Sequence, residues 1–320
     1  MVSRRIQLTG GSTYIVSLPS KWIKKNNISK GDEVFIDEQG NSITIYTKTA
    51  KKDEKIKKLI INGIPKDDEI QRYLISGYIA GYDSMIISSP FYINEKVRNS
   101  IKNFAKLVIG IEIFEEDSNK IVLQNVVKSD SMPLNRAIKR MSLNVESMIG
   151  DVIKGISEDD DSLLNNVISR DDEIDRFQWY IYREARISME DNSVFYLLLS
   201  RIMERIADHA VNLCNIWINR KRNIDIPKVK IIENLKEAFT IFQNAVSLFY
   251  SNDYKPINNI ISKKQDIYNS RKDLLFLSST QDIMTVSLSA EEISRIGLYA
   301  TDIAELALDA IFSSRDEISI

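Results

Sequence analysis

The chain has 320 residues, with 43 basic and 45 acidic side chains and a formal net charge of −2 at pH 7. This near balance excludes a global basic field, so any contact with nucleic acid must come from a local basic patch. A single cysteine, Cys214, and a single histidine, His209, exclude an intrachain disulfide and histidine-rich metal sites such as HExxH. With no apolar run long enough to span a bilayer and no signal peptide, we expect a cytoplasmic protein.

Residues 1–49 are predicted to form four short strands, RRIQL, TYIVSL, EVFIDE and ITIYT, around one helix, PSKWIKKNN. Pro19 is expected at the first helical position, and turns are expected at Gly10–Gly11, Gly31 and Gly40–Asn41. About fifty residues in short strands bury little core by themselves. We therefore expect a second chain to complete the core in an intertwined homodimer.

Residues 51–57, KKDEKIK, indicate a solvated linker. Strands and helices then alternate in the order βαβαββ over residues 55–128, from KLIING to KIVLQNVV. This order predicts a small α/β domain with a mixed sheet. The segment has no Gly-rich phosphate loop, so the sequence assigns it no role beyond spacing or dimer contacts.

Residues 131–315 are predicted to be almost wholly helical, and their pattern repeats. VISRDDEIDR at 167 aligns with IISKKQDIYN at 260, and MERIADHAVNLCN at 203 aligns with ISRIGLYATDIAE at 293. The similar offsets indicate a duplicated three-helix unit, with repeats at 131–222 and 226–315 that pack as two bundles. The helices of the first repeat are expected over about 133–156, about 161–189 and about 193–221.

Two acidic pairs, Asp171/Asp175 and Glu204/Asp208, lie on predicted helices of the first repeat. The i,i+4 spacing puts each pair on one helical face. The first pair lies at the edge of the apolar stripe of its helix, where an uncompensated carboxylate is costly. The main stripe of the second helix lies roughly opposite its acids, so the signal there is weaker. If the helices face each other, four carboxylates converge as ligands for a metal such as Fe, Mn, Mg or Zn.

The alternative is that four nearby arginines neutralise these acids in ordinary helix ion pairs. The arginines are Arg170, Arg176, Arg201 and Arg205. The second repeat keeps none of the four acids. Their replacements are, in order, Lys264, Tyr268, Ser294 and Leu298. If the acids bind metal, only the first repeat forms a site. His209 lies beside the apolar stripe of its helix and either packs there or contacts a metal or anion.

The run TGGSTYIVSLPSKWIKKNNISKGDEVFI resembles the swapped-hairpin DNA-binding domain of AbrB/SpoVT-type regulators, over essentially residues 3–48. In that family two chains interlock and present basic residues to DNA. The resemblance implies DNA contacts from Arg4, Arg5, Lys21, Lys24 and Lys25. Phosphate contacts of this kind give affinity and salt dependence with little base readout. The alternative is a dimerisation module that does not bind DNA.

The duplicated bundle, with DDEID and ERIADHAVN, resembles the PhoU family of phosphate-uptake regulators over most of residues 131–315. That family is built from two three-helix repeats whose E/DxxxD motifs bind multinuclear iron or zinc clusters. The resemblance implies that Asp171, Asp175, Glu204 and Asp208 bind Fe, Zn or Mn, whereas the second repeat departs from the motif. An AbrB-like domain before a PhoU-like domain resembles archaeal PhoU-type regulators.

These resemblances imply a homodimeric transcriptional regulator of phosphate uptake that binds DNA through residues 1–49 and metal through the four acids. The alternative is an adaptor that does not bind DNA and regulates a phosphate transporter, or its sensor kinase, through the helical domain. A carboxylate-bridged dimetal enzyme is disfavoured because such bundles use Glu-x-x-His pairs, which this chain lacks. We therefore expect a regulator and not an enzyme.

Overall fold

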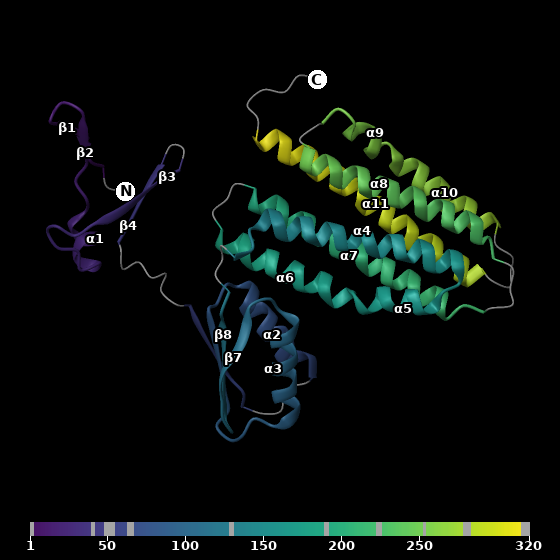
Figure 1. The fold of residues 1–320 in the computed structure, drawn as a ribbon, viewed down its shortest axis with the longest axis horizontal. Helices are drawn as coiled ribbons and strands as arrows, with labels where there is room; N and C mark the ends of the chain where they lie inside the picture. Colours follow the sequence, from purple (N-terminus) through teal and green to yellow (C-terminus); the bar gives the residue numbers. More distant parts are fainter. Residues whose placement is uncertain are drawn as a thin grey trace. The chain divides into compact units, whose positions relative to one another are not determined.

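The computed structural model describes residues 3–39, 42–47, 55–62, 67–127, 131–188, 192–221, 226–251, 254–277 and 283–314. The chain divides into two compact units, Met1–Glu54 and Lys55–Ile320. The first unit contains the small β region, and the second contains an α/β region followed by a helical region (Figure 1). The three predicted kinds of structure are therefore present in the predicted order.

The first unit contains two antiparallel hairpins and one short helix. Its elements are β1 (Gln7–Thr9), β2 (Thr13–Ile15), α1 (Ser20–Lys25), β3 (Val34–Gln39) and β4 (Ser42–Thr47). Gly10 and Gly11 turn the first hairpin with positive φ, which costs glycine little. Pro19 caps the helix instead of occupying its first position as predicted, because its ψ of 125° is extended. The predicted turn at Gly40–Asn41 lies outside the described residues.

Among the described side chains of the first unit, none is buried. Its strands nevertheless carry large apolar side chains, including Leu8, Tyr14, Phe35 and Ile43, and all four are exposed. Phe35 and Tyr46 stack on each other between β3 and β4, with ring centroids 5.9 Å apart. Two-stranded hairpins without a shared core are marginal in water. This unit therefore needs a further apolar surface to become stable.

The second unit begins with a four-stranded mixed sheet. The elements of this α/β region are β5 (Ile56–Ile60), α2 (Asp67–Ile79), β6 (Ser84–Ser88), α3 (Glu95–Leu107), β7 (Ile111–Glu116) and β8 (Lys120–Asn125). The strand order is β5-β6-β8-β7, in which β5 and β6 are parallel and the other neighbours are antiparallel. The predicted α/β organisation is correct, but the predicted linker 51–57 runs into β5 because Ile56 already pairs with Ser84.

A separate hydrophobic core joins the helices of the α/β region to its sheet. Val97, Ile101 and Phe104 recur at helical spacing on α3 and are buried. They pack with Ile87 of β6 and Leu123 of β8, which are also buried. Figure 1 shows α2 and α3 side by side against the sheet. This core therefore fixes the position of the sheet and of the loops at its edges.

The first helical repeat contains α4 (Leu134–Glu158), α5 (Asp161–Ser169), α6 (Asp171–Ile187) and α7 (Ser193–Ile218). The single helix predicted over 161–189 is wrong, because the structure breaks it at Arg170. The N–H of Arg170 donates to the oxygen of Val167 at 3.0 Å, and the N–H of Glu173 donates to the oxygen of Arg170 at 3.1 Å. These tight i,i+3 bonds replace the α-helical pattern for one turn.

The second helical repeat contains α8 (Lys228–Ser251), α9 (Ile257–Ile261), α10 (Lys263–Leu277) and α11 (Ile283–Ser314). Its middle helix is also broken, at Ser262, one position before the residue that aligns with Arg170. This shared break supports the predicted duplication. The long helices α4, α7, α8 and α11 lie alongside one another (Figure 1), and side chains from both repeats form one continuous core.

Candidate functional site

The two acidic pairs lie on adjacent helices that pack against each other, α6 and α7. Asp171 is the first residue of α6 and Asp175 follows one turn later, while Glu204 and Asp208 lie one turn apart on α7. Asp171, Asp175 and Glu204 are partly buried, and Asp208 is exposed. The break at Arg170 places Asp171 at a helix N-terminus, where the helix dipole favours a negative charge. We refer to these four residues as the acidic cluster.

Burial raises the affinity for protons of all four carboxylates in the acidic cluster, and neighbouring acids raise it further for Asp171, Asp175 and Glu204. The largest cause for each is desolvation, and the pKa values of Asp171, Asp175, Glu204 and Asp208 all rise above their ordinary values. The pKa of Asp175 rises to about 7, because its burial is reinforced by the charges of Asp171, Glu204 and Asp208. Residues of α6 thus respond to the charges of α7, so the two pairs face each other across the helix contact.

The arginines considered as alternative partners leave most of this negative charge uncompensated. Arg170 pairs instead with Asp151 of α4, at 2.5 Å. Arg205 donates a hydrogen bond to a tyrosine hydroxyl of α11 at 2.9 Å. In the described part of the chain, only Arg201 forms an ion pair with the cluster, at 3.6 Å from Glu204. Ordinary helix ion pairs therefore account for one of the four carboxylates.

The acidic cluster does not form a closed metal site in this arrangement. Across the described ranges, no three His, Cys, Asp or Glu side chains lie close enough together to hold one metal ion. The donor chemistry nevertheless suits a hard cation, because all four groups offer oxygen. In addition, Oε2 of Glu204 is buried and accepts no hydrogen bond from the residues that the structure describes, where its one ion pair is with Arg201. A metal ion would require the side chains to converge further, and the metal assignment stays a prediction.

His209 belongs to the contact between the two repeats. Its Nδ1 lies 2.6 Å from Oε2 of Glu292 on α11, and its ring stacks on Tyr299 with centroids 5.6 Å apart. Tyr299 is the residue that aligns with His209 in the second repeat. Contact between equivalent residues is expected where two copies of one unit pack about a pseudo-twofold axis. The structure therefore favours the packing role of His209 over a role as a ligand.

The second repeat carries its own cation at the position of Asp171. Lys264, which aligns with Asp171, places Nζ 2.7 Å from Oε1 of Glu305 and 3.4 Å from Oδ1 of Asp302. The lysine thereby joins α10 to α11 and compensates two acids without an added ion. The first repeat has a carboxylate at this position, so the two repeats differ in the sign of the charge that they place there.

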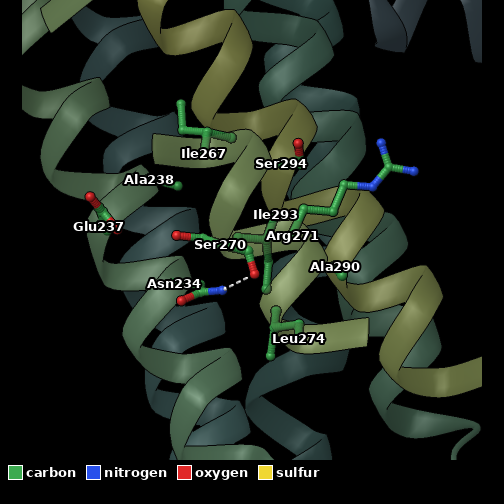
Figure 2. A pocket seen from close by; sticks show the side chains of 10 residues that line it. All are labelled: Asn234, Glu237, Ala238, Ile267, Ser270, Arg271, Leu274, Ala290, Ile293 and Ser294. Carbon is green, nitrogen blue, oxygen red and sulfur yellow. Dashed lines mark hydrogen bonds between the residues drawn. The ribbon is translucent and has the colours of Figure 1, made fainter. Parts of the chain in front are cut away.

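The position of Glu204 is also altered in the second repeat. Ser294 aligns with Glu204 and lines a cavity of about 20 Å³ between α8, α10 and α11 (Figure 2). Across this cavity the amide of Asn234 donates to the backbone oxygen of Ser270 at 3.2 Å, as Figure 2 shows. Such a volume holds about one water molecule. The second repeat therefore has a water-sized cavity where the first repeat has the carboxylate of Glu204.

An arginine that the sequence analysis does not identify connects α6 to the α/β region. Arg183 is only 2% exposed, and its guanidinium donates to the backbone oxygens of Tyr78 at 2.9 Å and Tyr82 at 2.8 Å. It also lies over the ring of Tyr78 and 3.5 Å from Asp83. The only signal in the sequence is its position three residues after the apolar Tyr180, and charged residues are seldom this buried. Helix α6 thus carries two members of the acidic cluster near one end and this anchor near the other.

The five cations predicted to contact DNA lie on two parts of the first unit. Arg4 and Arg5 precede β1, while Lys21, Lys24 and Lys25 lie on α1. All five are exposed, and none pairs with an acid among the residues that the structure describes. Exposed cations without acidic partners suit contacts with phosphate. DNA binding by these residues stays a prediction.

Comparison with protein families identifies two parts of the chain. The PhoU domain model matches residues 138–216, which include the whole acidic cluster, and the model described as "Antidote-toxin recognition MazE, bacterial antitoxin" matches residues 7–54. No curated protein matches the chain significantly. Within the described residues, no helix has the length and apolar character needed to cross a membrane.

Two solved structures share the fold of the helical region. PhoU from Pseudomonas aeruginosa is 18% identical with a TM-score of 0.52, and the match covers 57% of this chain and 96% of that one. The phosphate transport system regulatory protein PhoU from Streptococcus pneumoniae is 13% identical with a TM-score of 0.50, covering 58% and 96%. The Streptococcus pneumoniae protein is named as a regulatory protein, which agrees with the expectation of a regulator. The chain thus combines a MazE/AbrB-like domain with a PhoU domain, and its helical region has the PhoU fold.

Proposed function

We propose that the chain is a homodimeric transcriptional regulator of phosphate uptake, which binds DNA through its first unit and a metal ion through the acidic cluster. The observation that carries this proposal is the presence of a MazE/AbrB-like domain and a PhoU domain in one chain. The role in phosphate uptake follows from the fold shared with the Streptococcus pneumoniae protein, which is named as a phosphate transport system regulatory protein. In this proposal the helical region senses a ligand, and the first unit converts that signal into DNA affinity.

The homodimer is supported by the exposed apolar strands of the first unit. Leu8 and Tyr14 of the first hairpin and Ile43 of the second expose surface that a second chain can bury. Sedimentation of the full chain should give a dimer, and Leu8→Asp should shift it towards the monomer. Phe114→Asp, at an equally exposed apolar position on β7, is the matched control and should leave the dimer intact. A monomeric wild type would contradict this part of the proposal.

The DNA-binding part is tested by removing two exposed cations. Arg4→Ala/Arg5→Ala should weaken binding to all DNA sequences, and it should reduce the salt dependence of the binding constant by about 0.9 for each phosphate that is no longer neutralised. Arg136→Ala/Lys139→Ala removes two exposed cations from α4 and serves as the charge-matched control. Filter binding over a range of salt concentrations measures both effects. Equal affinity of the wild type and the Arg4/Arg5 variant would remove these residues from the interface.

The metal-binding part is supported by the uncompensated charge of the acidic cluster. A bound Fe, Mn or Zn ion would supply the positive charge that the four carboxylates lack. Elemental analysis of the purified protein should find metal in the wild type and little in Asp171→Ala/Glu204→Ala. The matched control is Asp302→Ala/Glu305→Ala, because these acids of the second repeat already have Lys264 as their partner. Equal metal content in the wild type and the first variant would exclude the site.

The second candidate is an adaptor that regulates a phosphate transporter component or its sensor kinase without binding DNA. The observation that favours it is the exposed apolar surface of the first unit, because dimerisation alone explains such strands. Immobilised full-length protein that retains the transporter ATPase, while showing no affinity for DNA at low salt, would support the adaptor. Salt-sensitive DNA binding that depends on Arg4 and Arg5 would exclude it.

A further inference from the structure

The α/β region has a cavity at the edge where its two parallel strands end. β5 and β6 are adjacent and parallel, so their carboxyl ends open on the same side of the sheet. The cavity has a volume of about 250 Å³ and is lined by residues that directly follow these strands, including Asn62 after β5 and Ser89 after β6. In open α/β sheets, ligands bind outside the carboxyl ends of the strands. The place and the size are those of a site for a small molecule.

Two neighbouring aromatic side chains stand at this cavity with most of their surface in solvent. Phe91 is 76% exposed and Tyr92 is 71% exposed, and both line the cavity. Burial of aromatic rings is strongly favourable, so two adjacent exposed rings mark a surface that gains stability when a ligand covers it. The polar groups beside them are the side chains of Asn62, Ser89 and Asn94. Within the described residues every side chain that lines the cavity is uncharged.

The wall that carries the two rings is held in place by hydrogen bonds to a neighbouring turn. The N–H of Ser89 donates to the oxygen of Asn119 at 2.9 Å, and the N–H of Ile93 donates to the oxygen of Ser118 at 2.8 Å. On the opposite side, the N–H of Ile61 donates to the oxygen of Ser88 at 2.8 Å. A loop fixed at both ends loses little conformational freedom when a ligand binds. The backbone of this wall is therefore held in place without a ligand.

We propose that this cavity binds a flat, uncharged heteroaromatic molecule of the nucleobase or nucleoside type. Phe91 and Tyr92 offer rings on which such a molecule stacks. The Asn62 amide has no hydrogen bond within the described residues, so it is free to offer both a donor and an acceptor to the edge of a base. The Asn94 oxygen already accepts from the N–H of Val97 at 2.9 Å, which leaves its NH₂ group for the ligand.

The test is calorimetric titration of the full chain with adenosine, guanosine, cytidine and uridine. At least one nucleoside should bind with a dissociation constant below about 1 mM. Tyr92→Ala should weaken that binding about tenfold, because base stacking on an aromatic ring is worth about 1–3 kcal/mol. Asn62→Ala should weaken it to a similar degree and should change the preference among the four bases, because the amide reads the edge of the base.

Phe114→Ala is the matched control, since Phe114 is 67% exposed on β7 and lies outside the cavity lining. Its binding should equal that of the wild type. Circular dichroism of all variants should be unchanged, because the substituted rings are exposed. Failure of all four nucleosides to bind, or binding that survives both Tyr92→Ala and Asn62→Ala, would overturn the proposal. Since the cavity shares no residue with the acidic cluster or the DNA-contacting cations, this result is independent of the proposed function.

Discussion

Asp175→Asn tests whether repulsion among the carboxylates of the acidic cluster destabilises the metal-free protein. The carboxylate of Asp175 is partly buried, has no ion pair or hydrogen bond within the described residues, and faces three other acids. Asparagine has nearly the same size and cannot ionise. Its substitution should therefore stabilise the metal-free protein at a pH where Asp175 is charged, which is the reverse of what most substitutions in a packed region do.

The size of the effect follows from the pKa of Asp175, which rises from 3.8 to about 7. Between pH 3.8 and about pH 7 the folded protein keeps a proton on Asp175 that the unfolded chain releases. The free energy of unfolding therefore falls as the pH rises through this range. At about 1.4 kcal/mol for each pKa unit, the full shift corresponds to about 4 kcal/mol. Because solvent reaches the cluster and screens the charge, about 1–2 kcal/mol is the expected gain near pH 8, with little gain near pH 4.

Urea unfolding in the presence of a chelator, followed by circular dichroism, measures this gain for the helices of the second unit. The control is Asp266→Asn on α10, because Asp266 pairs with Lys263 at 2.9 Å and its removal should not stabilise the protein. The difference between Asp175→Asn and the wild type must grow as the pH rises. An equal difference at both ends of the pH range, or a destabilised variant near pH 8, would refute the electrostatic reasoning.

Two further substitutions test other contacts of charged side chains in the second unit. Arg183→Met leaves the buried backbone oxygens of Tyr78 and Tyr82 without their hydrogen-bond donor. Urea unfolding should show a free energy of unfolding that is lower by about 2–4 kcal/mol. A decrease below about 1 kcal/mol would contradict an anchoring role. Lys264→Met removes the partner of Glu305, and because this pair is partly exposed the decrease should be only about 0.5–1 kcal/mol. High salt should abolish most of the second effect, and an effect that is independent of salt would show that the lysine acts through packing.

The sequence predicted the types of region and the pairing of the acids because both depend on local periodicity. The i,i+4 spacing of Asp171 and Asp175 survives in α6, since both residues lie on the same side of the break at Arg170. The break itself could not be predicted, because no proline or glycine marks it and the apolar pattern continues through it. A helical wheel drawn across residues 161–189 therefore treats two helices, α5 and α6, as one continuous helix.

Local sequence patterns could not predict which distant residues the arginine side chains contact. Which arginine is buried depends on the distant backbone oxygens that it meets, and Arg183 meets them at the end of α2 and in the turn that precedes β6. Arg170 likewise turns to Asp151 on α4 and not to the acid next to it in the chain. The sequence suggested four arginines as partners for the cluster, and only the fold shows that two of them, Arg170 and Arg205, bond to residues outside it.

The difference between the two repeats argues that packing does not require the charge of the acidic cluster. Lys264 and Asp171 occupy equivalent positions in the two repeats. In the second repeat Lys264 forms ion pairs with two acids of α11, whereas in the first repeat Asp171 lies beside three further acids. The contact between α10 and α11 therefore accommodates a cation that belongs to the chain itself, Lys264. Because the first repeat lacks that arrangement at Asp171, its carboxylates either take up protons, as the raised pKa of Asp175 indicates, or bind a cation from solution. Either event changes the charge at one end of α6, the helix that Arg183 fastens to the α/β region.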